Sequence, residues 1–157
     1  MRTFSLLKGL PIFELKTGSK IGEVCDLNIS NNGLVRGLLV KKGVFFKKTY
    51  VINVKNVSSF GFDGVMIEDR EVLKPLTEHK EFTFENRRDR LFGRMMMTNE
   101  GERLGMLEDV YFLEEAGTIV GYELSDGFFS DIMEGKRVVK TDEPPAIGKD
   151  AIIVNVK

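Results

Sequence analysis

One ten-residue pattern occurs twice in the chain, and this repeat limits the available folds more than any other feature. The pattern is Gly-x-x-Φ-Gly-x-Φ-x-Asp-Φ, where Φ is apolar, and its copies begin at Gly18 and Gly101. Further glycines follow in the same order in both copies: Gly33, Gly37 and Gly43 match Gly117, Gly121 and Gly127. Matching stretches that occur in the same order, with changes in spacing only between them, indicate an internal duplication. We therefore expect two small, similar domains within the 157 residues.

Each copy is expected to consist of short strands. Apolar and polar residues are interspersed with a period near two, as in half-buried strands, and the stretch from Leu34 to Val40 is rich in β-formers. Asn31-Asn32-Gly33 and Ala116-Gly117 predict tight turns because Asn and Gly adopt positive φ at low cost. No apolar stripe with helical spacing is present. The sequence predicts an all-β fold of two tandem small barrels, with domains at residues 1–76 and 91–157 and a charged linker at 77–90.

Composition and charge place the chain in a broad class. With 42% hydrophobic and 30% charged residues it has an ordinary globular balance. A single cysteine, Cys25, fits a reducing compartment, so we expect a cytoplasmic protein. No stretch approaches the ~20 apolar residues of a membrane span. The net charge of −1 combines +5 on residues 1–76 with −6 on the remainder, an asymmetry that indicates specialised surfaces.

These motifs together resemble the PRC-barrel family. The resemblance lies in the repeated Gly-x-x-Φ-Gly-x-Φ-x-Asp strand, the glycine turn, the valine-rich strand, a Gly-Phe-Phe hairpin and a closing Gly-x-Asp-x-Φ strand. PRC-barrels occur in the cytoplasmic part of the photosynthetic reaction-centre H subunit and in a ribosome-maturation factor that works with 16S rRNA. The resemblance implies a module that docks onto other macromolecules and carries no catalytic motif. The factor's separate N-terminal domain has no counterpart here, which argues against that particular role.

Residues that could carry chemistry are few. His79 is the only histidine and lies in the charged linker, so we expect a solvated side chain. Cys25 has no histidine nearby in sequence and is expected to be a small core residue. No cysteine and histidine spacing suggests a metal, and Asp26 and Asp109 are expected to accept backbone N–H groups near turns. We expect no enzymatic activity, no metal and no cofactor.

The most informative segment brackets two phenylalanines with lysines. Lys41, Lys42, Lys47 and Lys48 flank Phe45 and Phe46, and the second copy has Asp126, Phe128, Phe129 and Asp131 at the same place. The phenylalanines are present in both copies, whereas the lysines of the first copy are replaced by aspartates in the second. Three roles stay open: rings that support the hairpin, a patch that docks onto protein, and a surface that contacts RNA through phosphate and base stacking.

Two further clusters have simpler interpretations. Met95-Met96-Met97 matches Pro11-Ile12-Phe13 and is expected to form the first strand of the second barrel. Arg87, Arg88, Arg90 and Arg94 could contact phosphate, but nearby acidic residues (Glu81, Glu85 and Asp89) predict a solvated, self-paired linker.

The sequence therefore favours a non-enzymatic adapter whose partner is a protein. The alternative is an RNA-associated factor that binds through the first hairpin and the arginine cluster. A homo-oligomer also stays open, in which the basic hairpin of one molecule meets the acidic hairpin of another.

Overall fold

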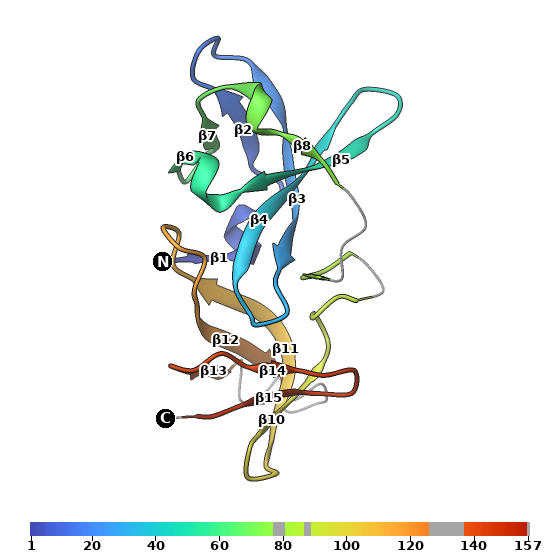
Figure 1. The fold of residues 1–157 in the computed structure, drawn as a ribbon, viewed down its shortest axis with the longest axis vertical. Helices are drawn as coiled ribbons and strands as arrows, with labels where there is room; N and C mark the ends of the chain where they lie inside the picture. Colours follow the sequence, from blue (N-terminus) through green and yellow to red (C-terminus); the bar gives the residue numbers. More distant parts are fainter. Residues whose placement is uncertain (77–80, 87–88, 126–136, 157) are drawn as a thin grey trace.

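The computed structural model describes residues 1–76, 81–86, 89–125 and 137–156, and it consists of two β-sheets with very little helix (Figure 1). The first sheet has the strand order β6-β7-β2-β3-β4-β5-β8. These strands are β2 (Pro11–Glu14), β3 (Lys20–Ile29), β4 (Val35–Lys42), β5 (Lys48–Asn53), β6 (Val57–Phe60), β7 (Val65–Ile67) and β8 (Lys74–Pro75). Short helical turns lie beside them: α1 (Phe4–Leu7), η1 (Val54–Asn56) and η2 (Arg70–Val72).

The second sheet repeats this arrangement strand by strand. Its order is β14-β15-β10-β11-β12-β13, and its long strands are β11 (Arg103–Phe112) and β12 (Ile119–Ser125). The others are β10 (Met95–Thr98), β13 (Arg137–Lys140), β14 (Ala146–Ile147) and β15 (Ile152–Val154). In the first sheet β2 pairs antiparallel with β3 and parallel with β7. In the second sheet β10 pairs in the same way, antiparallel with β11 and parallel with β15. The predicted all-β fold of two tandem barrels is confirmed.

The repeated glycines occupy matching positions in the two ladders. Gly22 lies opposite Ile12, and Gly105 lies opposite Met96. A Cβ atom at Gly22 would come within 2.6 Å of the Lys41 carbonyl oxygen, and one at Gly105 within 2.6 Å of the Ser125 carbonyl oxygen. Both positions therefore require glycine because the next strand passes too close for a side chain.

Side chains from every long strand form the hydrophobic core, which is continuous across both halves. The alternation of buried and exposed residues is interrupted in β3. Its pairing with β2 shifts register opposite Ile12 and Phe13, and its pairing with β4 shifts between Val24 and Asp26. Because of these bulges, Ile21, Val24 and Leu27 lie on the same buried face although they are three residues apart. All three side chains are at most 6% exposed. Met96 is fully buried, which confirms that the methionine run forms the first strand of the second barrel.

Each half donates a short segment to the sheet of the other half (Figure 1). Strand β1 (Arg2–Thr3), at the start of the first half, pairs with β11, with Thr3 opposite Tyr111. Strand β9 (Phe82–Thr83), ahead of the second half, pairs with β3, with Thr83 opposite Asn28. We call residues 2–5 and 82–86 the exchanged segments. The second of them lies inside 77–90, the range assigned to the linker from sequence.

Two buried aspartates hold the exchanged segments. The Asp26 carboxylate accepts N–H bonds from Phe84 (3.1 Å), Glu85 (2.9 Å) and Asn86 (2.8 Å). Asp109, its repeat partner, accepts from Phe4 (3.1 Å) and Ser5 (3.3 Å). Capping of backbone N–H groups was predicted for both aspartates. Each also accepts from the residue that follows it, Leu27 (2.8 Å) or Val110 (2.9 Å), but the other donors belong to the opposite half of the chain. Burial raises the pKa of the Asp26 carboxyl, and the N–H bonds from Leu27, Asn86 and Glu85 oppose that rise.

Where the two halves meet, equivalent residues face each other. The rings of Phe4 and Phe84 pack edge to face with their centroids 5.1 Å apart, and both are almost fully buried. The predicted turns also meet there, since the Val35 N–H donates to the Gly117 carbonyl at 2.8 Å. Gly117 has φ +77°, and a Cβ atom at this position would overlap the Val35 carbonyl oxygen. The turn glycine is thus required by its conformation and by the contact between the halves.

Glu14, at the end of β2, forms the most extensive ion pair of the described chain. Its side chain is 3% exposed and accepts bonds from Thr17 Oγ1 (2.6 Å), Arg70 Nη2 (2.9 Å) and the Arg70 backbone N–H (2.6 Å). These bonds, above all those from Arg70, lower the pKa of Glu14 from 4.5 to about 2. Glu14 thereby ties η2 to the end of the first barrel.

The depressed pKa of Glu14 predicts a particular acid dependence of stability. A carboxylate with a lowered folded-state pKa stabilises the fold above its unfolded-state value, and this contribution disappears as pH falls through the folded-state value. The difference in unfolding free energy between the native chain and Glu14→Gln should be constant above about pH 5 and shrink between pH 4.5 and about 2. Urea unfolding across this range measures it. Glu100→Gln, at an exposed carboxylate, should show no such change, and a pH-independent difference at Glu14 would contradict the assignment.

Candidate functional site

The segment from Lys41 to Lys48, here called the basic hairpin, projects from the first barrel beyond the body of the sheet (Figure 1). The last residue pair of β4 and β5 is Lys42 opposite Lys48, and residues 43–47 connect the strands. Gly43 has φ +127°, and a Cβ atom there would overlap the Phe46 carbonyl oxygen. The compact loop therefore depends on glycine at this position.

The apolar residues at the tip of the basic hairpin contact almost nothing. Val44 is 86% exposed, Phe45 91% and Phe46 88%. The interpretation that these rings support the hairpin is therefore wrong, because rings this exposed contribute no packing. Three consecutive large apolar side chains exposed to water are an unusual feature of a protein surface.

The lysines of the basic hairpin leave its charge largely uncompensated. Within the described residues, Lys41, Lys42, Lys47 and Lys48 take part in none of the salt bridges. Glu23, which lies opposite Lys41 in the ladder, is paired with Lys20 at 2.8 Å. This hydrogen bond lowers the pKa of Glu23, and the charge of Lys47 lowers it further. The hairpin therefore presents an excess of positive charge.

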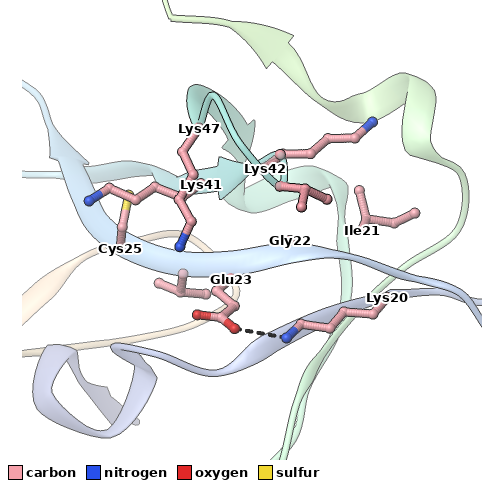
Figure 2. A pocket seen from close by; sticks show the side chains of 11 residues that line it. Lys20, Ile21, Gly22, Glu23, Cys25, Lys41, Lys42 and Lys47 are labelled. Atoms are coloured by element: carbon pink, nitrogen blue, oxygen red, sulfur yellow. Dashed lines mark hydrogen bonds and ion pairs between the residues drawn. The ribbon is translucent and has the colours of Figure 1, made fainter.

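A groove lies between the basic hairpin and the first half of β3 (Figure 2). It has a volume of about 440 Å³. Gly22 forms part of its floor, and Lys41 and Lys47 reach over it from the hairpin in Figure 2. Ile21, Val24 and Val44 add apolar surface, so the groove offers both charge and apolar contact. Lys20, Glu23 and the groove floor were not foreseen from sequence, although they fall within the first copy of the repeated motif.

Cys25 lines the same groove and is half-buried, where the sequence suggested a core residue. Burial raises the pKa of its thiol, so the side chain stays protonated at neutral pH and is a poor nucleophile. His79, the only histidine, lies outside the described residues. Among the described residues no three His, Cys, Asp or Glu side chains converge so that they could hold a metal ion.

The second barrel has a smaller groove at the equivalent place. Arg103, Leu104, Gly105 and Arg137 line it, and the Arg137 guanidinium donates to the Leu104 carbonyl. Arg103 and Gly105 are the repeat equivalents of Lys20 and Gly22, so the position keeps a basic residue. Asp126, Phe128, Phe129 and Asp131, predicted as its acidic hairpin, lie outside the described residues.

The arginine cluster of the connecting segment is only partly described. Arg87 and Arg88 fall outside the described residues, while Arg94 donates to the carbonyls of Arg90 (3.0 Å) and Gly148 (2.7 Å). Its guanidinium also lies over the Phe82 ring, 5.1 Å from the centroid, so Arg94 has a structural role.

Two acidic residues of this segment pair with basic residues of the first barrel; whether acidic residues also pair with Arg87 and Arg88, as the sequence predicted, lies outside the described residues. Glu81 binds Arg36 at 2.9 Å, and Glu85 binds Lys8 at 2.5 Å. Both bonds tie the segment to the first barrel. In the part of the chain that the structure describes, no helix has the length and apolar character to cross a membrane.

Comparison with known proteins agrees with this architecture. The chain is 34% identical over 158 residues to the uncharacterized protein YrrD of Bacillus subtilis (strain 168), an alignment that covers 99% of this chain and 88% of that protein. The family model of the PRC-barrel domain matches residues 1–74 and again residues 85–157, so it accounts for each of the two sheets. Since the two matches leave only the connecting residues uncovered, the chain belongs to the PRC-barrel family and contains the domain twice.

Proposed function

We propose that this chain is a non-enzymatic docking module that binds a protein partner through the basic hairpin and the adjoining groove. The observation that carries the proposal is the tip of the hairpin, where Val44, Phe45 and Phe46 are each at least 86% exposed. Aromatic side chains are the usual anchors of protein interfaces, and they gain most when a partner's recess buries them completely.

The surrounding charge indicates what the partner surface contains. Lysines without acidic partners steer association with a surface of opposite charge and raise the rate of encounter. A fitting partner has an apolar recess for the two rings and carboxylates around it. The groove beside β3 would take a side chain of that partner.

Catalysis has little support at this site. The thiol of Cys25 has a raised pKa, and no imidazole lies among the described groove residues. We therefore propose binding without chemistry. A cytoplasmic location is proposed as well, on the basis of the single cysteine.

RNA is a second candidate partner, favoured by one observation. Phe45 and Phe46 are 91% and 88% exposed and lysines flank them, an arrangement that lets bases stack while ammonium groups contact phosphates. The hairpin supplies only a short basic surface, however, so we rank this role second.

Exchange of Phe45 and Phe46 for alanine tests the proposal. With the partner isolated by affinity capture from native cells, we expect the double variant to bind at least about tenfold more weakly, or about 1.4 kcal/mol. Phe62→Ala is the matched control, since Phe62 is 88% exposed at a different hairpin. Equal loss in both variants, or no loss in either, would argue against docking through the basic hairpin.

Salt and nuclease distinguish the two kinds of partner. Binding to a protein partner should persist after nuclease treatment and should depend only modestly on salt, mainly through the association rate. An RNA partner should be lost on nuclease treatment, and its affinity should fall by roughly one power of salt concentration for each phosphate neutralised.

A further inference from the structure

Glu23 on β3 has lysines on two sides and pairs with one of them. Its carboxylate lies 2.8 Å from the Lys20 ammonium, and both side chains are about half exposed. Lys41 lies directly opposite Glu23 in the ladder between β3 and β4, and side chains in opposed positions are close enough to form an ion pair. Figure 2 shows Lys20 at the Glu23 carboxylate, while Lys41 and Lys47 extend from the basic hairpin. Glu23 therefore stands between two sets of cations.

A bulge in β3 places Lys20 beside Glu23. On a regular strand, residues three apart point to opposite faces. The pairing of β3 with β2 joins Gly22 to Ile12 and Lys20 to Phe13, so β3 has one extra residue at this point. The extra residue brings Lys20 and Glu23 to the same face. The ion pair is thus a consequence of the backbone geometry of β3.

The second barrel keeps the bulge but has no acidic residue at this position. The pairing of β10 with β11 shows the same shift of register. Met106 is the repeat equivalent of Glu23, and it lies opposite Ser125, where Glu23 lies opposite Lys41. The acidic residue is therefore not required by the barrel. It occurs in the copy whose hairpin carries the lysines.

Glu23 and a carboxylate of the partner would compete for the same ammonium groups. In the described chain neither Lys41 nor Lys47 forms an ion pair. The hydrogen bond from Lys20 lowers the pKa of Glu23, and the charge of Lys47 adds to this effect, so the hairpin already favours a carboxylate at the groove. Without Lys20, Glu23 would turn to the hairpin lysines and neutralise part of their charge.

We infer that Lys20 is a positioning residue for partner binding: it holds Glu23, so that Lys41 and Lys47 stay free for a carboxylate side chain of the partner. Val44 lines the same groove, so an apolar residue next to that carboxylate also fits. The inference rests on the proposed function and names the chemistry that the groove selects, which is a Glu or Asp side chain beside an apolar one.

The first test is an NMR titration of the full chain with the peptide acetyl-Glu-Glu-Leu-Glu-amide. About 20 mM salt is suitable, because exposed charges are then only weakly screened. We expect shift changes at Gly22, Glu23 and Gly43. The same peptide with glutamine in place of glutamate should bind at least about tenfold more weakly, because it offers the lysines no charge. Equal binding of both peptides, shift changes centred elsewhere, or no binding would overturn the inference.

A double-mutant cycle isolates the role of Lys20. Lys20→Gln should weaken the acidic peptide about threefold, and Glu23→Gln should strengthen it about twofold, as is usual for exposed ion pairs. In the chain that carries Glu23→Gln, adding Lys20→Gln should change the affinity less than about 1.5-fold, because no carboxylate is left to hold. An equal effect of Lys20→Gln in both backgrounds would overturn the inference, since Lys20 would then act only through its own charge.

The pKa of Glu23 gives a second readout, measured by NMR at its side-chain carboxyl. In the Lys20→Gln chain this pKa should stay below its ordinary value, because the hairpin lysines replace Lys20. Its return to the ordinary value would contradict the competition. Lys55→Gln is the charge-matched control: Lys55 is exposed on η1, and its loss should change the peptide affinity less than about 1.5-fold.

Failure of this inference and failure of the proposed function give different results. The peptide has no recess for Phe45 and Phe46, so exchange of both rings for alanine should leave its affinity unchanged while weakening the captured partner. If the ring variant loses the partner but the peptide does not bind at the groove, only the inference is overturned. If the ring variant keeps the partner and the peptide binds as expected, the groove stands as a carboxylate site and the proposed docking through the rings fails.

Discussion

Replacing Asp26 with alanine is expected to lower the unfolding free energy by about 3–5 kcal/mol. The carboxylate is fully buried and accepts the N–H groups of Phe84, Glu85 and Asn86 from the exchanged segment, besides that of Leu27 (2.8 Å). Alanine would leave these donors without an acceptor in a closed interior. Each buried unpaired donor costs about 1–3 kcal/mol, and partial opening of the segment to water limits the total.

A series of related variants separates this effect from simple loss of charge. Asp26→Asn keeps one acceptor oxygen and should cost about 1–2 kcal/mol. Asp109→Ala should cost about 2–3 kcal/mol, because Asp109 holds only two donors of the exchanged segment, at 3.1 and 3.3 Å. Chemical denaturation gives all three values. Losses below about 0.5 kcal/mol, as at ordinary surface sites, or a larger loss at Asp109 than at Asp26, would contradict the assigned role.

The architecture was predictable because duplication leaves a strong signal. Gly22 and Gly105 stand at the same point of each ladder, where strand proximity excludes a side chain, so the repeat of glycines carried real structural information. The turn at Gly33 was also predictable, since Asn-Gly favours the positive φ that it adopts. The bulges in β3 were not, because register is set by pairing with β2 and β4 and not by β3 alone.

The exchange of segments could not be predicted from local pattern. Thr3-Phe4 and Thr83-Phe84 are short matches outside the main repeat, and nothing in two residues specifies which sheet they join. Long-range contacts decide it: the bonds to Asp26 and Asp109 and the packing of Phe4 on Phe84. The aspartates were recognised as N–H acceptors, but the donors Phe84 and Phe4 in the exchanged segments lie 58 and 105 residues away along the chain.

The candidate site was predicted in part. The basic hairpin was singled out from sequence, and the structure places its lysines and rings on one projecting element. Whether the rings were packed or exposed could not be decided from sequence, since Gly-Phe-Phe is compatible with both.

Separation of the chain into residues 1–76 and 77–157 should yield two polypeptides that fold poorly alone and recover the native fold when mixed. Each polypeptide carries the exchanged segment of the other: β1 and Phe4 complete the second barrel, and β9 and Phe84 complete the first. Alone, each half would leave an aspartate without its donors and expose part of a core that is continuous in the whole chain. Domains of this size bury a small fraction of their surface on folding, so their free energy of unfolding is small.

The mixed halves should associate with a Kd of about 1 µM or tighter, about −8 kcal/mol, and regain dispersed amide resonances. Size-exclusion chromatography and NMR of each half and of the mixture measure this. Phe84→Ala in the second half is the sharpest variant, because it removes a fully buried ring that packs against Phe4 while leaving the strand bonds of β9 possible. It should weaken association by about 3–5 kcal/mol, the usual cost of a buried Phe→Ala change. Phe45→Ala in the first half, at a ring that is 91% exposed, should leave association unchanged within about threefold. Two halves that each unfold cooperatively on their own and do not bind each other would show that the exchanged segments are dispensable, and that the two barrels are independent domains.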